Sequence, residues 1–384
     1  MNNYLFKRNF SILFSCVLSF SIVSCRTDAP VIPSEQHETG DSSQTDIRGF
    51  YLLNEGNLGS NKASLDYYDF ATGTYTTDIY ASRNPSVVKE LGDVGNDLQI
   101  YGHRMYAVIN ASNKVEVMTA DSAIRIGHID VPNCRCLAFE GKYGYVTSYA
   151  GPIVIGEEHA QIGYVLKFDT ATLQTIDTCH VGFQPEGIAI ANGKLYVANS
   201  GGYLTTTYDT TMSVIDLTTF KQTKRLNIDI NMQHVMVDKY NRIWVNSLGN
   251  YYETPSRLYC IDTNTDKIVK QFDFPVTNFC LSGDSIYFYS TAWNYTDMTN
   301  SVSYGILNIA TMDLLTQHFI IDGTESDIEI PYGISVNPIS HDIYITDAKT
   351  YTIPGALHCY SAQGEKKWSV RTGDIPAHFC FLTK

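Results

Sequence analysis

The 384-residue sequence lacks the short motifs that identify the common enzyme classes. It contains no G-x-S-x-G nucleophile elbow, no H-E-x-x-H zinc motif, no EF-hand loop and no P-loop, so no catalytic chemistry can be read from a motif. Basic residues are also scarce, with 27 Lys and Arg against 40 Asp and Glu, and they form no stripe that could follow a phosphate backbone. The sequence therefore excludes nucleic acid as an expected partner.

The clearest feature that the sequence does contain is a short apolar segment, called a phrase below, which occurs seven times along the chain. Six of the seven copies are followed, after a short turn, by a second strand-like phrase that contains an aromatic residue, as in Tyr196 and Trp244. These aromatic residues recur about every 49 residues, a period that suits four short strands per blade of a β-propeller. The seven copies of the first phrase begin at Leu98, Leu137, Ile188, Val235, Phe279, Ile334 and Phe379.

One repeat illustrates the predicted blade. Its β-branched and aromatic runs alternate with polar residues, are separated by turn residues such as Asn192-Gly193, and show no sustained helical period. The pattern is typical of half-buried antiparallel strands. The expected strands of this repeat cover 186–191, 194–199, 212–216 and 224–228.

The seventh phrase finds its partner at the opposite end of the chain, in residues 50–53. Pairing the two ends would remove the exposed sheet edges that an open arc carries. We therefore predict an all-β fold, a seven-bladed β-propeller in which the C-terminal strand at 377–382 completes the first blade. The outer three strands of that blade are expected at 50–54, 64–70 and 75–80.

The N-terminus has the organisation of a secretory signal. Lys7 and Arg8 precede an apolar stretch at 10–23 that is too short to span a bilayer. Cys25 directly follows Ser24, an arrangement that resembles the lipobox of bacterial lipoproteins, in which this Cys is acylated. An ordinary signal peptide with an incidental cysteine is the alternative. The expected domains are a signal peptide at 1–24, the lipidated Cys25 with a flexible tether at 25–47, and the propeller at 48–384.

Metal sites and disulfides have little support. Beyond Cys16 and Cys25 there are seven cysteines, an odd number, and most fall inside strand phrases, so we interpret them as small buried side chains. Cys134 and Cys136 form a single pair without a second, which is weak evidence for a metal. An oxygen cage for calcium is conceivable from four further residues, but repetition explains them without an ion, and no metal site is predicted: Asn199, Asn246, Asp347 and Glu186.

Long loops are expected on one face of the ring, where the loops between second and third strands lie, and they are rich in aromatic residues. Tyr and Trp combine a flat apolar surface with a polar group, so their clustering on loops favours a binding face. The alternative is that these residues pack their own loops. The predicted aromatic ligand contacts are Tyr149, Tyr203, Tyr208, Tyr251, Tyr252, Trp293, Tyr295 and Tyr351.

A second set of candidates comes from aligning the residue two places before each inner-strand phrase. These residues should border the mouth of the central channel on the same face, and six of the seven can form hydrogen bonds. A water-filled channel with a polar lining is the alternative. We call this set the mouth ring: Asn96, Arg135, Glu186, Gln233, Thr277, Tyr332 and Ala377. His234 and His378 lie one position further along and are interpreted as wall residues rather than metal ligands.

The lipobox, the acidic tether, the opening residues 49–57 and blades of the form seen at 185–217 resemble the YncE-like surface propeller lipoproteins of gut Gram-negative anaerobes. Within that group the chain is most similar to the BtuG-type propellers that bind vitamin B12. The resemblance covers about residue 47 to the end. It implies a non-enzymatic protein, without a catalytic cofactor, that is anchored by lipid to the outer membrane at the cell surface.

The same resemblance implies the ligand and the partner. The expected ligand is cobalamin or a related corrinoid, and the expected partner is a TonB-dependent outer-membrane transporter that receives it. A surface glycan-binding protein of a polysaccharide-uptake system is the main alternative, since sugars also stack on Tyr and Trp. A calcium-dependent propeller hydrolase or lyase and a purely scaffolding protein are further alternatives.

Overall fold

The structure is a computed structural model that describes residues 34–43, 45–87, 90–153, 160–204, 206–251, 253–294 and 299–384, with only the backbone described at 292–294, 299 and 300. The predicted signal peptide and the lipidation site at Cys25 lie outside the described residues. Among the described residues, no helix has both the length and the apolar character needed to cross a membrane.

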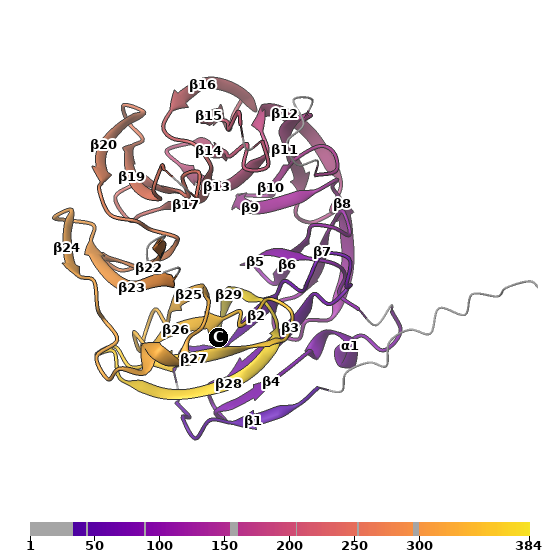
Figure 1. The fold of residues 1–384 in the computed structure, drawn as a ribbon. Coiled ribbons are helices and arrows are strands. Elements are labelled where there is room, and N and C mark those ends of the chain that lie inside the picture. The colour runs from indigo at the N-terminus through magenta and orange to yellow at the C-terminus, as the bar shows by residue number, and fades with distance from the viewer. Residues whose placement is uncertain are drawn as a thin grey trace, which may run out of the picture. The chain divides into compact units, whose positions relative to one another are not determined.

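Seven small antiparallel sheets stand in a ring and form a seven-bladed β-propeller (Figure 1). This confirms the predicted fold class. The blade used above to illustrate the repeat has each strand within three residues of its expected bounds. It consists of β13 (Pro185–Ala191), β14 (Lys194–Asn199), β15 (Thr211–Asp216) and β16 (Lys221–Asn227).

The other complete blades follow the same order from the inner strand outward. The second blade has β5 (Gly95–Tyr101), β6 (Arg104–Ile109), β7 (Lys114–Thr119) and β8 (Arg125–Asp130), and the third has β9 (Cys134–Glu140), β10 (Tyr143–Ser148), β11 (Ile162–Asp169) and β12 (Thr175–Phe183). The fifth has β17 (Met232–Val237), β18 (Arg242–Ser247), β19 (Arg257–Asp262) and β20 (Lys267–Phe272). The sixth has β21 (Asn278–Ser282), β22 (Ser285–Asn294), β23 (Thr299–Asn308) and β24 (Asp313–Thr316). The seventh follows a short 3-10 helix, η1 (Thr324–Asp327), and has β25 (Pro331–Val336), β26 (Ile343–Asp347), β27 (Pro354–Tyr360) and β28 (Lys366–Asp374).

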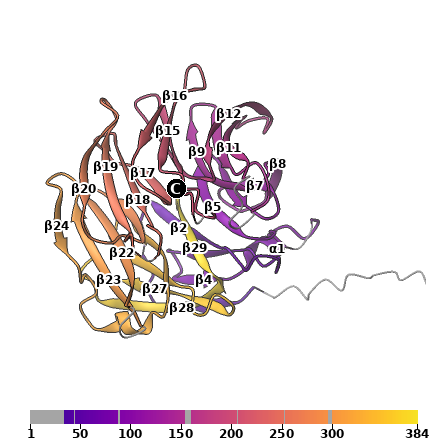
Figure 2. The ribbon, with the colours of Figure 1, turned by 45° about the horizontal axis from the view of Figure 1, so that its top comes forward.

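The first blade is built from both ends of the chain, as predicted. β29 (Pro376–Thr383) forms its inner strand and pairs with β2 (Ile47–Asn54), which pairs in turn with β3 (Ser64–Asp69) (Figure 2). The outer part differs from the prediction, because β4 covers only Thr74–Thr76 and is followed by helix α1 (Ile79–Arg83). Asp78 adopts a left-handed φ of 43°, which ends the strand, and the buried Tyr80 then reaches Glu116 on β7 with a hydrogen bond of 3.0 Å.

The expected tether also differs in its described part. β1 (Gln36–Glu38) pairs with β4 and adds a fifth, outermost strand to the first blade. Beyond it, the amide of Thr39 donates to Gly73 O at 2.9 Å and the amide of Ser43 donates to Phe70 O at 2.8 Å. The edge of β4 therefore organises this polar segment, whose own sequence carries no strand pattern.

Equivalent aromatic residues fill the contacts between blades. Six of the seven second-strand aromatic side chains are fully buried, and each removes a large apolar surface from water. These are Tyr51, Tyr106, Tyr145, Tyr196, Trp244 and Tyr344. The seven cysteines from Cys134 onward are free thiols, six of them buried, in agreement with their interpretation as small core side chains.

Candidate functional site

A cavity of about 580 Å³ lies on the axis of the ring and is lined by the inner strands of all seven blades. All seven residues of the mouth ring line it, so the alignment of repeats placed them correctly. Several inner strands carry a β-bulge at this level, between Gly95 and Asp97 on β5 for example, and between Met232 and Val235 on β17. A bulge turns consecutive residues toward the same side. Pairs such as Gln233 and His234 therefore both line the cavity.

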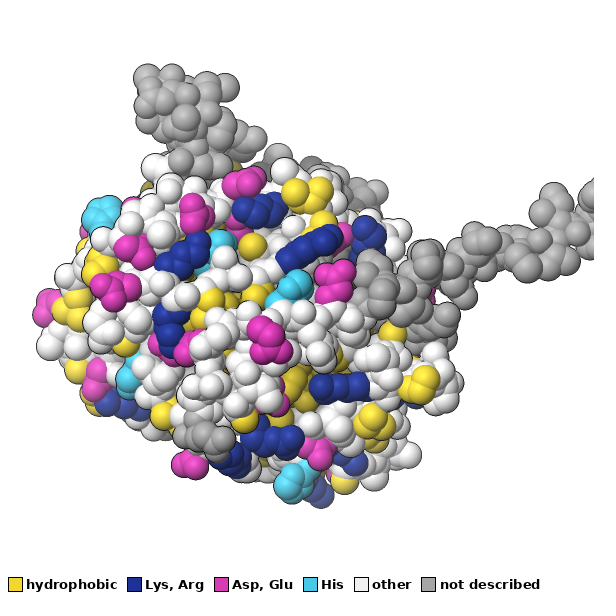
Figure 3. Space-filling view, turned by 90° about the horizontal axis from the view of Figure 1, so that it is seen from below, with side chains coloured by type: hydrophobic (Ala, Val, Ile, Leu, Met, Phe, Trp, Pro, Cys, Tyr) yellow, Lys and Arg dark blue, Asp and Glu magenta, His cyan; other side chains and the backbone are white. Residues whose placement is uncertain are grey.

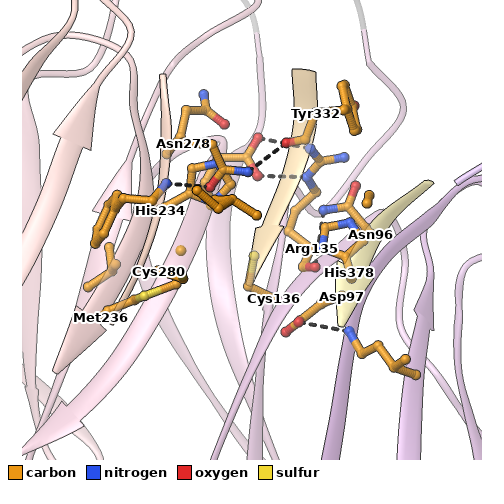
Figure 4. Close-up of a pocket in the computed structure, with 18 of the residues that line it drawn as sticks. Asn96, Asp97, Arg135, Cys136, His234, Met236, Asn278, Cys280, Tyr332 and His378 are labelled. Atoms are coloured by element: carbon orange, nitrogen blue, oxygen red, sulfur yellow. Dashed lines mark hydrogen bonds and ion pairs between the residues drawn. The ribbon is translucent and has the colours of Figure 1, made fainter. Parts of the chain in front are cut away.

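Arg135 and Glu186 form a paired charge on one side of the mouth ring. Nε and Nη2 of Arg135 donate to the two carboxylate oxygens of Glu186 at 2.9 and 3.1 Å, and the Glu186 side chain is only 6% exposed (Figure 4). Burial, the largest single effect, disfavours the guanidinium charge, but Glu186, Tyr149 and Tyr203 together outweigh it and raise the pKa of Arg135 well above its ordinary value. Arg135 is therefore positively charged at neutral pH, and the pair is held in a bidentate geometry.

Tyr149 supports this pair. Its hydroxyl donates to Glu186, and the Arg135 guanidinium lies 4.9 Å from the centre of its ring. The side chain is 4% exposed, and burial, together with the Glu186 charge, raises the pKa of its hydroxyl well above the ordinary value. The sequence predicted a ligand contact on a loop here, with packing of the loop as the alternative. The structure instead buries Tyr149 beneath the mouth ring, where it fixes Arg135 and Glu186.

Glu55 brings a second carboxylate to the mouth ring, and the sequence analysis did not identify it. Its Oε2 accepts a hydrogen bond from the Tyr332 hydroxyl at 2.8 Å, and its Oε1 lies 3.1 Å from Nε2 of His378. The backbone amide of Glu55 donates to Ile375 O at 2.8 Å, and its carbonyl accepts from the amide of Gly95 at 2.9 Å. These bonds fix Glu55 at the end of β2 with its side chain over the cavity.

Asp97 and His234 lie on the cavity wall beyond the mouth ring (Figure 4). The Asp97 carboxylate accepts from the amides of Leu98 and Leu137, both at 2.8 Å, and from Nε2 of Gln99 at 3.0 Å. Burial raises the pKa of Asp97, while the nearby His378 and these donors act in the opposite direction. Burial, assisted by His378, lowers the pKa of His234 to about 4, so this imidazole is neutral near pH 7.

A family model described as "Domain of unknown function (DUF5074)" matches residues 48–382. The chain belongs to this family. No curated protein matches the chain.

Solved structures share the fold of this DUF5074 domain at low sequence identity. A quinonprotein alcohol dehydrogenase-like protein from Bacteroides thetaiotaomicron is 15% identical, with a TM-score of 0.63 over 88% of this chain and 79% of that one. A hypothetical selenium-binding protein from Sulfolobus tokodaii is 10% identical, with a TM-score of 0.60 over 90% and 97% of the two chains. Hydrazine synthase from Kuenenia stuttgartiensis is 15% identical, with a TM-score of 0.55 over 70% and 76%. At these identities the similarity shows the propeller fold alone.

The remaining predicted aromatic contacts of the DUF5074 domain fall into three groups. Tyr203 lines the cavity, and Tyr351 is 42% exposed with its ring 6.0 Å from that of Tyr332. Tyr251 is 62% exposed and Tyr208 is half-buried. Tyr252 and Tyr295 lie outside the described residues, and only the backbone of Trp293 is described.

The predicted loop at 291–300 is largely an extended hairpin. β22 continues to Asn294 and β23 begins at Thr299, so Trp293 pairs with Asn300 in a strand rather than lying in a loop. Thr, Tyr and Trp at these positions have substantial strand propensity, which the loop prediction overlooked.

The four residues weighed as a calcium cage have structural roles instead. Asn246 accepts from the His234 amide at 2.8 Å and donates to Thr277 O at 2.8 Å, which ties two neighbouring blades together. Asp347 accepts from the amides of Glu329 and Ile330. Asn199 donates to Ser213 in its own blade and accepts from the amide of Gly182 on β12 of the neighbouring blade at 2.9 Å. Among the described residues, Asp41, Asp342 and Cys359 lie close enough together to hold a metal ion. The Lys367 ammonium already lies 2.7 Å from the Asp41 carboxylate and 3.0 Å from that of Asp342.

Proposed function

We propose that this protein is a non-catalytic binding protein that captures cobalamin or a related corrinoid at the mouth of its central channel. The observation that supports the proposal is the mouth itself, where seven different side chains of the mouth ring surround a cavity of about 580 Å³. A corrin ring is flat and fringed by amides, so it needs hydrogen-bonding partners of both kinds and aromatic surfaces beside them.

The size of the cavity suits partial entry of such a ligand. Its volume lies in the range of ordinary small-molecule sites, so it holds a part of a corrinoid, while the remainder lies on the surrounding loops. Tyr251 and Tyr351 are 62% and 42% exposed, so part of each side chain faces solvent, and aromatic rings can stack on a flat ligand. In this arrangement the tyrosines on the loops supply most of the affinity, and the mouth ring sets the orientation of the ligand.

The chemistry of the cavity supports binding rather than covalent catalysis. Burial raises the pKa of the Cys280 thiol to about 12, and burial with the Asp97 charge raises that of Cys136 well above its ordinary value. Both thiols are therefore protonated at neutral pH and are weak nucleophiles. Arg135 and Glu186 form an ion pair with each other, so neither side chain is positioned as an acid or base for catalysis.

Calorimetry with cyanocobalamin tests the ligand. We expect saturable heat with the wild-type chain, and weaker binding for Gln233→Ala than for Gln271→Ala, a matched change on the exposed outer strand β20. Absence of heat at micromolar protein would reject the corrinoid proposal. Heat with oligosaccharides in its place would favour the glycan-binding alternative.

The proposal includes a lipid anchor at Cys25, exposure at the surface of the outer membrane and transfer of the ligand to a TonB-dependent transporter. Metabolic labelling with a fatty acid should mark the wild-type chain and not Cys25→Ala. Protease added to intact cells should degrade the anchored protein if it faces outward. Co-purification of a transporter from detergent-solubilised membranes tests the partner.

A further inference from the structure

The charged groups that line the cavity are mostly of one sign. They comprise three carboxylates, on Glu55, Asp97 and Glu186, a single guanidinium on Arg135, and the imidazole of His378, whose Nε2 lies 3.1 Å from Oε1 of Glu55. Arg135 is already bound by both oxygens of Glu186, and His378 lies against Glu55, so no unpaired cationic side chain remains among the described residues that line the cavity. By contrast, acidic and basic side chains are mixed on the part of the outer surface seen in Figure 3.

Glu55 is surrounded by aromatic side chains. The hydroxyl of Tyr332 donates to it, the hydroxyl of Tyr289 donates to the backbone carbonyl of Tyr332 at 2.6 Å, and the ring of Tyr351 packs edge-on against that of Tyr332. Tyr203 lines the same cavity. Tyrosine ring faces are electron-rich and favour cations, so they act in the same direction as the carboxylate.

The Glu55 carboxylate still has acceptor capacity. A carboxylate offers about four lone-pair positions, and the structure gives Glu55 two partners, Tyr332 and His378. Its negative charge also reaches the neighbouring phenols. After burial, it contributes to the raised pKa of Tyr203, Tyr289, Tyr332 and Tyr351. Glu55 is therefore a centre of negative potential at the mouth.

Asp97 extends this potential along the wall. It lies beyond the mouth ring, and three N–H donors hold its carboxylate in place. His234 on β17, which lines the same cavity, is neutral near pH 7 and adds no positive charge. A group that enters the channel thus passes Glu55 first and approaches Asp97 afterwards.

We propose that the channel selects its ligand by charge: the part that enters is cationic or neutral and carries N–H donors, whereas anionic groups stay outside. The inference rests on the proposed function only for the identity of the ligand. For a corrinoid, it places the amide-bearing edge of the corrin in the channel and the phosphate-bearing nucleotide tail on the loops. Electrostatic focusing within a low-dielectric channel makes this discrimination stronger than on an open surface.

Two cobalt complexes of similar size and opposite charge test the proposal with the full mature chain. We expect hexaamminecobalt(III), a trivalent cation with outward N–H groups, to bind in calorimetry at about 0.15 M salt, where exposed charges are screened. Hexacyanocobaltate(III), a trivalent anion, should not bind. Binding of the anion, or failure of the cation to bind, would overturn the proposal.

Variants locate the site. Because a hydrogen bond to a charged group contributes substantially, Glu55→Gln should weaken hexaamminecobalt(III) binding about tenfold or more, and Asp97→Asn should weaken it in the same direction. Asp130→Asn removes an equal charge from an outer strand, where the side chain is 88% exposed, and should leave binding unchanged. Equal effects of all three changes would assign the binding to the acidic surface and reject the inference.

The outcomes for the ligand and for the channel are separable. Heat with cyanocobalamin but none with hexaamminecobalt(III) would uphold the proposed function and reject charge selection. The opposite result would reject corrinoid binding and uphold a channel that admits cations.

Discussion

Equivalent positions of the seven blades carry nearly the same side chain where the blades pack together, but seven different residue types where they face the channel. The second strands contribute six Tyr and one Trp to the packing between blades. The mouth ring contributes Asn, Arg, Glu, Gln, Thr, Tyr and Ala. Packing demands a uniform side chain from each repeat, since every blade meets the same kind of neighbour. Side chains on the channel wall are free of that demand, so they are the positions at which a ligand can be specified.

The largest expected effect comes from breaking the ring. Deletion of residues 376–384 removes β29, which pairs with β2 along its whole length and forms the inner strand of the first blade. Its loss exposes a sheet edge and the adjoining core, so we expect the protein to lose its cooperative thermal transition in circular dichroism. Removal of residues 1–38 is the matched control, because among the described residues it takes away only the outermost strand β1 and the two residues before it. A truncated protein that melts like the full chain would contradict the closure.

A substitution in each class tests the comparison directly. Tyr196→Ala empties a fully buried position and removes a hydroxyl that donates to Asp266 at 2.6 Å, so it should reduce the free energy of unfolding by about 3–5 kcal/mol. Asn96→Ala on the mouth ring removes one long hydrogen bond to Arg135 O and should cost less than about 1 kcal/mol. Urea denaturation measures both. Similar losses of unfolding free energy in the two variants would show that the channel positions also stabilise the fold.

The predictable part of the molecule follows the same division. The ring, its closure and the mouth ring were predictable because each is expressed at a regular interval in the sequence. Glu55 was not, because its partners Tyr332 and His378 are 277 and 323 residues away and no repeat links them. Burial of Tyr149 was missed for a related reason, since its position depends on Arg135 and Glu186 from two neighbouring blades.

Local pattern also failed where tertiary contacts decide the structure. Helix α1 is only five residues long and exists because Ile79 and Tyr80 are buried against the second blade. Strand β1 consists of polar residues and is formed by pairing with an edge strand. Neither element has a periodicity that a sequence could reveal.

Two histidines with similarly lowered pKa values, His358 in the core and His234 on the channel wall, extend the comparison to low pH. His358 is 4% exposed, and neither of its ring nitrogens has a hydrogen-bond partner among the described residues. Burial, assisted by Lys366, lowers its pKa to about 4. The unfolded chain, with a His pKa near 6.5, therefore takes up the proton first, so stability is full above about pH 6.5 and falls as the pH drops toward 4.

We expect His358→Leu to remove up to about 3 kcal/mol of this acid-induced loss, measured as the difference in unfolding free energy between pH 6.5 and 4.5. His234 lies on the cavity wall and has a similar pKa, so His234→Leu should remove an acid-induced loss of similar size. An identical pH profile for the wild-type chain and His358→Leu would contradict the burial argument.

The smallest effect on stability should accompany a measurable effect on binding. Tyr351 is 42% exposed, so Tyr351→Ala should change the free energy of unfolding by less than about 0.5 kcal/mol. Loss of one stacking ring should nevertheless weaken cyanocobalamin binding by roughly two- to tenfold in calorimetry, because an aromatic contact contributes about 0.5–1.5 kcal/mol. Tyr240→Ala is the matched control, since Tyr240 is 46% exposed on the turn between β17 and β18, at the opposite end of β17 from Gln233. Equal binding by both variants would remove the tyrosines from the proposed contact surface and leave the mouth ring to supply affinity as well as orientation.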